Sequence, residues 1–254
     1  MKPRLVVTTS WDDGHPADMR LAELLAKYGV AGTFYVPNRN AEGRPVLSAG
    51  DVKELSTRFE IGGHSVDHMV LTGLANDEAE RQIVENKRWL ENVTSKPVRG
   101  FCYVRGRYNR TLKDIVRRSG FEYARTVENL HSSMPADAFE MPTTIQLYPH
   151  NRISYLKNFA RGRLTSTRAR QLWVALASED LAQRLERLVG LCESTGGYFH
   201  LWGHSWEIEE RNLWGVFEAI LARLAAAATS IDFMTNYQVC SKVCSNIQRV
   251  RQRE

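Results

Sequence analysis

The sequence has few cysteines and no long apolar run, and both absences narrow the classes of protein that it can encode. Its four cysteines, Cys102, Cys192, Cys240 and Cys244, are too few and too dispersed for a disulfide framework. No segment is long and apolar enough to span a membrane, and the first residues lack the apolar core of a signal peptide. We therefore expect a cytoplasmic protein without stable membrane insertion, in which Cys240 and Cys244 are structural thiols.

The sequence also lacks a strong excess of charge of either sign. It holds 34 Lys and Arg residues against 29 Asp and Glu residues, which gives a formal net charge of +5 at pH 7. This balance suits an anionic substrate or carrier but is too mild to indicate a nucleic-acid partner. The basic run at 248–253 is predicted to be a solvated chain end. We therefore divide the chain into one domain at 1–240 and a basic tail at 241–254.

The rest of the composition is that of an ordinary soluble protein. Hydrophobic residues make up 43% of the chain and charged residues 25%. A length of 254 residues fits one large domain, and barrels of this size commonly form a single unit. The sequence contains no internal repeat, and it does not indicate an oligomeric state.

Predicted strands alternate with predicted helices along most of the chain. Apolar runs bounded by turn residues predict strands at 5–9, 33–36, 59–61, 98–103, 121–125, 198–202 and 231–234. Helical spacing predicts helices at 17–28, 48–58, 77–93, 110–119, 167–177, 179–194 and 212–228. Residues 126–164 are expected to be mainly loop, with one strand near Ile145. This alternation predicts an α/β fold, a distorted parallel barrel of about seven strands.

Two short motifs carry most of the chemistry in the sequence. Ser10-Trp11-Asp12-Asp13-Gly14 follows the first predicted strand, and His64-Ser65-Val66-Asp67-His68 follows the third. Each motif alone has a simpler interpretation, since Asp-Asp-Gly is common in turns and a pair of histidines can occur by chance. Because strands of a parallel barrel bring their C-terminal ends to one mouth, we expect the two motifs to meet there. Three oxygen and nitrogen ligands plus a spare carboxylate are typical of a catalytic metal site.

The first motif resembles that of the polysaccharide deacetylases, the NodB-homology family or carbohydrate esterase family four. The second motif is similar to the family's pair of histidines separated by three residues. This resemblance implies that Asp13, His64 and His68 bind a divalent metal, usually zinc. Cobalt, manganese and iron also suit such ligands. It further implies that Asp12 is the general base that takes a proton from water at the metal.

The segment at 101–109 stands where the family's third motif belongs, and it departs from the family pattern. Cys102 takes the place of the usual arginine or alanine, Val104 replaces proline, and Arg105 replaces an aromatic residue. These changes alter the expected shape of the substrate groove. Tyr103 and Arg105 are nevertheless our candidates for substrate contact in this segment.

The last two family motifs are matched only loosely. Arg125, at the end of its predicted strand, is expected to pair with Asp12 and tune its basicity. The segment at 199–207 offers two histidines for the role of general acid. We favour His204, which follows a strand and a glycine and has Glu207 nearby to orient it. His200 lies within the strand, where a satisfied core histidine is the commoner outcome, and together with Trp202 it is a candidate for substrate binding.

The sequence thus predicts a hydrolase that removes an acetyl group from an N-acetylated carbohydrate, such as an oligosaccharide, a glycolipid or a nucleotide-sugar precursor. One alternative keeps the metal and the fold but cleaves a non-sugar amide or imide, as the altered third motif suggests. The other alternative is a glycan-binding module without catalysis. The presence of Asp12 beside a complete set of metal ligands disfavours that module, because binding alone needs no spare base.

Overall fold

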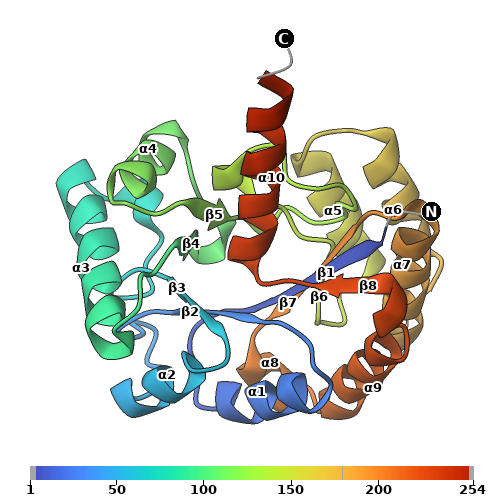
Figure 1. Ribbon diagram of the computed structural model, residues 1–254, viewed down its shortest axis with the longest axis horizontal. Coiled ribbons are helices and arrows are strands. Elements are labelled where there is room, and N and C mark those ends of the chain that lie inside the picture. The colour runs from blue at the N-terminus through green and yellow to red at the C-terminus, as the bar shows by residue number, and fades with distance from the viewer. Residues whose placement is uncertain (1–3, 179, 252–254) are drawn as a thin grey trace.

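The computed structural model describes residues 4–178 and 180–251, with side chains as far as Val243 (Figure 1). Its strands are β1 (Leu5–Trp11), β2 (Thr33–Val36), β3 (Glu60–Gly63), β4 (Gly100–Cys102), β5 (Tyr123–Arg125), β6 (Ile145–Gln146), β7 (Tyr198–Gly203) and β8 (Ile231–Phe233). Its helices are α1 (Asp18–Lys27), α2 (Ala49–Leu55), α3 (Asn76–Thr94), α4 (Arg110–Arg118), α5 (Arg152–Arg161), α6 (Ser166–Leu176), α7 (Leu181–Thr195), α8 (Ser205–Glu210), α9 (Trp214–Ala226) and α10 (Asn236–Arg251). Within these residues no helix combines the length and the apolar character that a bilayer crossing needs.

The strands form one parallel sheet in the order β5-β4-β3-β2-β1-β7-β6, and β8 pairs with the first residues of β1. The sheet curls until its two edges approach each other. Met141 pairs with Arg125 of the edge strand β5, and a few residues later the amide of Thr144 donates to the carbonyl of His200 in β7. The helices surround the sheet, as Figure 1 shows. The predicted distorted parallel barrel in a single domain is therefore confirmed.

Strand β1 lies inside the sheet between β2 and β7 and is buried along its whole length. It pairs with β7 over six residues and with β2 at its end. Burial on both faces explains why its sequence reads as a continuous run rather than as an alternation of polar and apolar residues. Its polar side chains have partners: Thr8 donates to Asn236 at 2.7 Å, and Ser10 lies 2.8 Å from His200.

Local sequence signals explain where several elements begin and end. Ser48 caps α2, accepting from the Asp51 amide while the Asp51 carboxylate accepts from the Ser48 amide, so the two residues form a capping box. Gly14 lies in the turn after Asp13 with φ of +57°, and a Cβ atom there would lie 2.8 Å from Val36. Only glycine fits this turn without strain. The turn sends the chain away from the barrel mouth directly after the acidic pair.

Three helices were not expected from the sequence. Helix α5 lies within 126–164, which we expected to be mainly loop; it is capped by Asn151, and only Tyr155 among its residues is buried. Because Ile153 and Leu156 are exposed, the apolar residues of α5 do not mark a buried helix face, and the sequence shows little helical periodicity there. Helix α8 is too short for periodicity to reveal, with six residues. Helix α10 begins at Asn236, ahead of the boundary that we expected at residue 240.

Helix α10 covers the end of the barrel at which the strands begin. Its Val239 and Cys240 pack in one buried cluster with Val6 and Tyr198, which stand near the starts of β1 and β7. The backbone of α10 continues to Arg251, while the side chain of Cys244 and the predicted tail at 248–253 lie outside the described side chains. With one end covered, the opposite end of the barrel is left for a site.

Candidate active site

The C-terminal ends of the strands surround a cavity of about 280 Å³. Most residues that the sequence singled out converge here from β1, the loop after β3, the loop after β4 and the end of β7. The cavity is lined by Asp12, Asp13, Glu42, Arg44, His64, His68, Arg105, Val127, Trp202, His204 and Trp206. The position of this cavity is the one that a parallel barrel favours for chemistry.

Asp13, His64 and His68 point their ligand atoms at one spot in this cavity. Asp13 Oδ1 lies 3.0 Å from His68 Nε2 and 3.5 Å from His64 Nε2. All three side chains are buried, and their ligand atoms lie within 4.8 Å of one another. One carboxylate oxygen and two imidazole nitrogens are the donors of many catalytic metal centres, which keep a further position open.

Neighbouring groups hold these three side chains in position. The Nδ1 atom of His64 lies 2.9 Å from the backbone carbonyl of Cys102, which can only accept a hydrogen bond. This contact places the proton on Nδ1 and leaves Nε2 with its lone pair toward Asp13, as a metal ligand requires. The indole of Trp206 donates to Asp13 Oδ2 at 2.9 Å. Asp13 Oδ1 has no hydrogen-bond donor in the part of the chain that is described, so it remains available to a cation.

Backbone strain is concentrated at the same place. Asp13 and His68 adopt the left-handed conformation with φ of +76° and +54°, and Arg105 at the cavity rim has φ of +53°. Residues other than glycine adopt this conformation at a cost, and such strain clusters at functional sites. Two of the three proposed ligands, Asp13 and His68, thus have a strained backbone conformation that points their side chains into the cavity.

The charge distribution also suits a cation. Burial raises the pKa of Asp13, but His64 and His68 outweigh this effect, so its pKa lies well below the usual value and the carboxylate is ionised. Burial lowers the pKa of His64, yet the nearby acidic groups, Asp13 among them, raise it well above the usual value. The cluster thus attracts positive charge, and a cation bound there would displace a proton.

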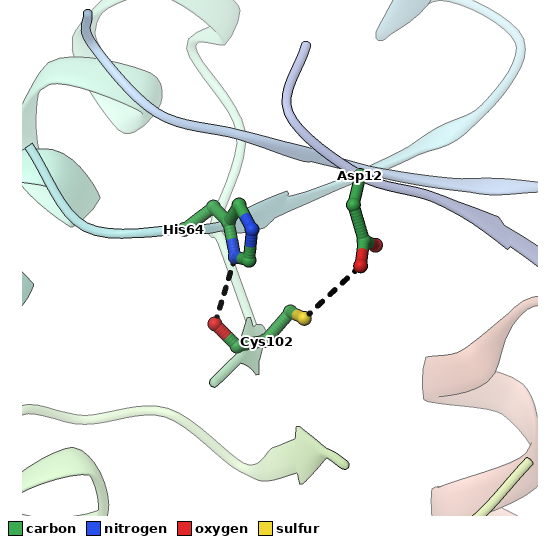
Figure 2. Close-up of side chains that lie close together, drawn as sticks. All are labelled: Asp12, His64 and Cys102. Carbon is green, nitrogen blue, oxygen red and sulfur yellow. Dashed lines mark hydrogen bonds between the residues drawn. The ribbon is translucent and has the colours of Figure 1, made fainter. Parts of the chain in front are cut away.

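A second cluster shares His64 and lies next to the first. Figure 2 shows Asp12, His64 and Cys102 facing one another, with the Cys102 thiol 3.6 Å from Asp12 Oδ2. Burial raises the pKa of Cys102, so the thiol keeps its proton and is a poor metal ligand. Asp12 is already engaged by Arg125. The cluster of Asp13, His64 and His68 is therefore the better candidate for a metal.

Asp12 forms a buried ion pair with Arg125, as the sequence led us to expect. Nη2 of Arg125 donates to Asp12 Oδ1, and both side chains are almost fully buried. Burial disfavours the charged guanidinium, but Asp12 outweighs it and raises the pKa of Arg125. The guanidinium also lies over the ring of Trp202, 4.8 Å from its centre. Asp12 consequently lines the cavity as a fixed carboxylate that is not among the three converging ligands.

His204 occupies the opposite wall of the cavity. Its Nδ1 lies 2.7 Å from Glu207 Oε2, and its ring stacks on Trp206 with centres 5.3 Å apart. Burial lowers the pKa of His204, but Glu207 and Asp13 outweigh it and raise the pKa above the usual value. Glu207 orients the ring so that Nε2 faces the cavity, 3.9 Å from Asp13 Oδ2. This arrangement suits a proton donor.

Two of the expected substrate-binding residues lie elsewhere. His200 is fully buried between the hydroxyl groups of Tyr198 and Ser10, at 2.7 and 2.8 Å. Burial lowers its pKa well below the usual value, so it is a neutral core histidine. Tyr103 is also buried, and its hydroxyl donates to the carbonyl of Phe139. Neither lines the cavity, whereas Arg105 and Trp202 do.

Three further residues at or near the site were not expected from the sequence. Glu42 and Arg44 come from the loop between β2 and α2, which contains no motif, and Arg44 lies over Trp206 at 3.5 Å from the ring centre. Asp18, at the start of α1, is fully buried with neither carboxylate oxygen hydrogen-bonded to a described residue. Burial, together with the charges of Asp13 and Asp12, raises its pKa well above the usual value.

The chain is similar in sequence to a known family over its first half. Residues 2–124 match the family model described as Polysaccharide deacetylase. The "Putative polysaccharide deacetylase YxkH" of Bacillus subtilis (strain 168) is 24% identical over 124 residues, which are 48% of this chain and 44% of that protein. The chain thus covers less than half the length of this relative. The matched region contains both short motifs.

Solved structures resemble the whole chain. A protein described as a putative polysaccharide deacetylase from Mycobacterium smegmatis has a TM-score of 0.68 at 15% identity, over 97% of this chain and 92% of that chain. A family 4 acetyl xylan esterase from Clostridium thermocellum, in complex with a cobalt ion, has a TM-score of 0.58 at 15% identity, over 93% and 90% of the two chains. At these identities the likeness shows a shared fold.

Proposed function

We propose that the chain is a member of the polysaccharide deacetylase family, whose model matches residues 2–124, and that it is a metal-dependent hydrolase that removes an acetyl group from an N-acetylated sugar. The observation that supports this proposal most is the convergence of Asp13, His64 and His68 beside Asp12, which does not belong to their set. A binding module would need no such carboxylate. The carbohydrate class is suggested by the family and by the two indoles, Trp202 and Trp206, that line the cavity.

Asp13, His64 and His68 would hold the divalent cation. The donor set of one oxygen and two nitrogens suits zinc, and it equally accepts cobalt, manganese or iron. The relative from Clostridium thermocellum is described with cobalt, which supports a cation of this kind. When bound, such a cation polarises the carbonyl of the substrate and lowers the pKa of water.

Asp12 would act as the general base. Its pair with Arg125 fixes the direction of its carboxylate, while the Cys102 thiol lies beside Oδ2. A base must lie within hydrogen-bond reach of the proton that it removes, and Asp12 is adjacent in sequence to the ligand Asp13. We therefore assign to Asp12 the removal of a proton from the attacking water.

His204 would act as the general acid that protonates the leaving amine. It lines the same cavity as Asp12, with Glu207 accepting from Nδ1 and Nε2 facing inward. Trp206 packs on one side of its ring, so the imidazole has little freedom to turn. Asp12 and His204 thus both line the cavity, where they would supply the base and the acid that amide hydrolysis requires.

Acetate release from N-acetylglucosamine oligomers tests this proposal. The protein is loaded in turn with zinc, cobalt, manganese or iron and assayed beside an Asp12→Asn variant loaded in the same way. We expect acetate from the wild type and almost none from the variant. Release at equal rates from both proteins, or from neither with any of the four cations, would contradict the proposal.

One observation favours a second candidate, the hydrolysis of a non-sugar amide or imide. Arg105 stands at the rim where an aromatic residue is usual in the family, and it is paired with Glu42 at 2.6 Å. A charged rim suits a compact polar amide as well as a sugar. The same assay with a panel of small amides separates the two, since this candidate predicts turnover of the amides and none of the oligomers.

A further inference from the structure

We propose that the outer surface of α5 and α6 binds an anionic lipid bilayer at its interface. We call this surface the α5–α6 face and define it by Ile153, Leu156, Leu164 and Trp173 together with the cations Lys157 and Arg170. This inference goes beyond the proposed function, because it holds whether or not the cavity hydrolyses an amide. It rests on charge, exposure and position.

The segment at 141–178 is unusual in holding basic residues and no acidic ones. It contains six Lys and Arg residues and no Asp or Glu. The other 28 Lys and Arg residues are matched by all 29 Asp and Glu residues of the chain. Lys157 and Arg170 are exposed and have no carboxylate partner among the described side chains. The face therefore presents two exposed cations, Lys157 and Arg170, that no carboxylate of the described side chains offsets.

Large apolar side chains stand out from the same surface. Of the five exposed large hydrophobic residues in the described part of the chain, four lie on α5, on α6 or in the turn that joins them. Their exposed fractions are 60% for Ile153, 48% for Leu156, 73% for Leu164 and 76% for Trp173. Such a concentration on one side of a protein marks a contact surface, since scattered apolar residues would be distributed over all sides.

The spacing of these residues directs them outward together. On α5, Ile153 and Leu156 are exposed beside Arg152 and Lys157, while Tyr155 faces the core. On α6, Arg170 and Trp173 are three apart on the exposed side, while Gln171 and Ala175 face inward. Leu164 lies in the turn between the two helices. Cations that alternate with aliphatic and indole side chains are typical of helices that lie in a membrane interface.

The surface is fixed to the barrel by one buried residue. Arg168 is fully buried, and its guanidinium donates to the carbonyls of Asn129, Phe159 and Arg163. It thereby joins the end of α5, the turn and the start of α6 to the loop after β5. The face is preformed, so binding need not spend free energy on ordering it.

The face also borders the mouth of the cavity. A second hollow of about 400 Å³ shares Arg105 and Val127 with the cavity and extends to Asn158 and Arg161 on α5. A bilayer held against α5 and α6 would therefore lie beside the opening. This position favours access from the surface of the lipid, where a headgroup could enter.

Among anionic partners, a bilayer explains the surface best. A nucleic acid would pair with the cations but would not bury the apolar side chains of Ile153, Leu156 and Leu164. A protein partner would require a contiguous apolar patch, and here cations separate the apolar side chains. In a bilayer, the indole and the aliphatic side chains would enter the boundary between headgroups and acyl chains, while the lysine and arginine would contact anionic headgroups.

Vesicle sedimentation tests the inference. Metal-loaded protein is mixed with vesicles of phosphatidylcholine alone or of phosphatidylcholine with phosphatidylglycerol, without any sugar substrate. We expect binding only to the anionic vesicles. The double variant Lys157→Glu/Arg170→Glu should bind at least about 30-fold more weakly, because each cation near such a surface contributes about fivefold. Trp173→Ser should also weaken binding, since its side chain no longer enters the interface.

The matched control reverses two exposed cations on the far side of the barrel. Arg88→Glu/Arg118→Glu changes α3 and α4, which lie opposite α6 in Figure 1, and it should bind as the wild type does. Equal loss in both double variants would show a net-charge effect and overturn the proposal. Unchanged vesicle binding by Trp173→Ser would also overturn the proposal, because it would indicate a polyanion as the partner. Dimerisation of the wild type without lipid, abolished in Trp173→Ser, would overturn it as well. Thermal unfolding confirms that each variant is folded.

Discussion

Arg125 and Asp12 form an ion pair in the floor of the cavity, with the Arg125 side chain fully buried and the Asp12 side chain 4% exposed. The pair links the end of β5 to the residue that follows β1, so it connects strands from opposite parts of the sheet order. A buried charge without its partner is strongly unfavourable. This relationship makes the stability of the fold depend on the proposed catalytic base.

Replacement of Arg125 by methionine should destabilise the protein by about 3–5 kcal/mol, because Asp12 is then buried without a counter-charge. Urea unfolding of the wild type and the variant measures the loss. Adding Asp12→Asn to Arg125→Met should restore part of it, since the orphaned charge is removed. Arg118→Met on the exposed side of α4 serves as the control, with a change within about 0.5 kcal/mol. Equal stability of Arg125→Met and the control would contradict the account.

Replacement of Asp12 by asparagine should abolish most activity and leave metal binding intact. General-base catalysis contributes about 10²–10⁴-fold, and the loss should fall in that range. Asp12 is not one of the three converging ligands, so the metal content of the variant should equal that of the wild type. Steady-state kinetics and elemental analysis on the same preparation check both statements. Loss of the metal from Asp12→Asn would instead place Asp12 among the ligands.

Replacement of Glu207 by glutamine should lower kcat by about 10- to 100-fold, the equivalent of one charge-assisted hydrogen bond. The reason is that Glu207 orients His204 and stabilises its protonated form. Glu209→Gln on the same helix is the matched control, because the Glu209 carboxylate accepts from the indole of Trp214 rather than from His204. A similar kcat for both variants would remove Glu207 from the proposed mechanism.

Replacement of Asp18 by asparagine should stabilise the protein increasingly as the pH rises above 4. The folded pKa of Asp18 lies well above its unfolded value, so folding takes up a proton in the window between the two. The contribution of Asp18 to stability is therefore fully present below the unfolded pKa and is lost as the pH rises toward the folded one. An asparagine carries no such dependence.

Urea unfolding of both proteins at pH 4 and pH 7 measures this effect. The free energy of unfolding of Asp18→Asn, relative to the wild type, should be larger at pH 7. Asp114→Asn, on the outer side of α4, should show no comparable trend. A relative stability that is independent of pH would mean that Asp18 is ionised in the folded protein.

Sequence was sufficient to predict the parts of the site that follow strand ends. Asp13, His64 and His68 come directly after apolar runs, and the parallel arrangement of those runs follows from their alternation with helices. Arg125 and His204 were candidates because they stand at or just past the end of a strand in segments that loosely resemble two family motifs. Each of these residues lies where the predicted element placed it, because the strand that carries it is buried and its register is tightly constrained.

Contacts between distant segments could not be predicted. The carbonyl of Cys102 that orients His64 depends on the pairing of β3 with β4, which local sequence does not reveal. Asp18 reads as an ordinary acidic residue in the first turn of a helix, and only the packing of α1 under the cavity buries it. His200 is the satisfied core histidine that its place within the strand favoured, whereas Tyr103, a candidate for substrate contact, turns into the core.

The most direct test of the account is the metal content of protein purified without chelator, compared with that of His68→Ala. His68 contacts Asp13 at the cavity surface and supplies one of the three ligand atoms. We expect about one equivalent of a divalent metal per chain in the wild type and a large loss in the variant. No metal in the wild type, even after incubation with zinc or cobalt, would contradict the central claim that these three residues form a metal centre.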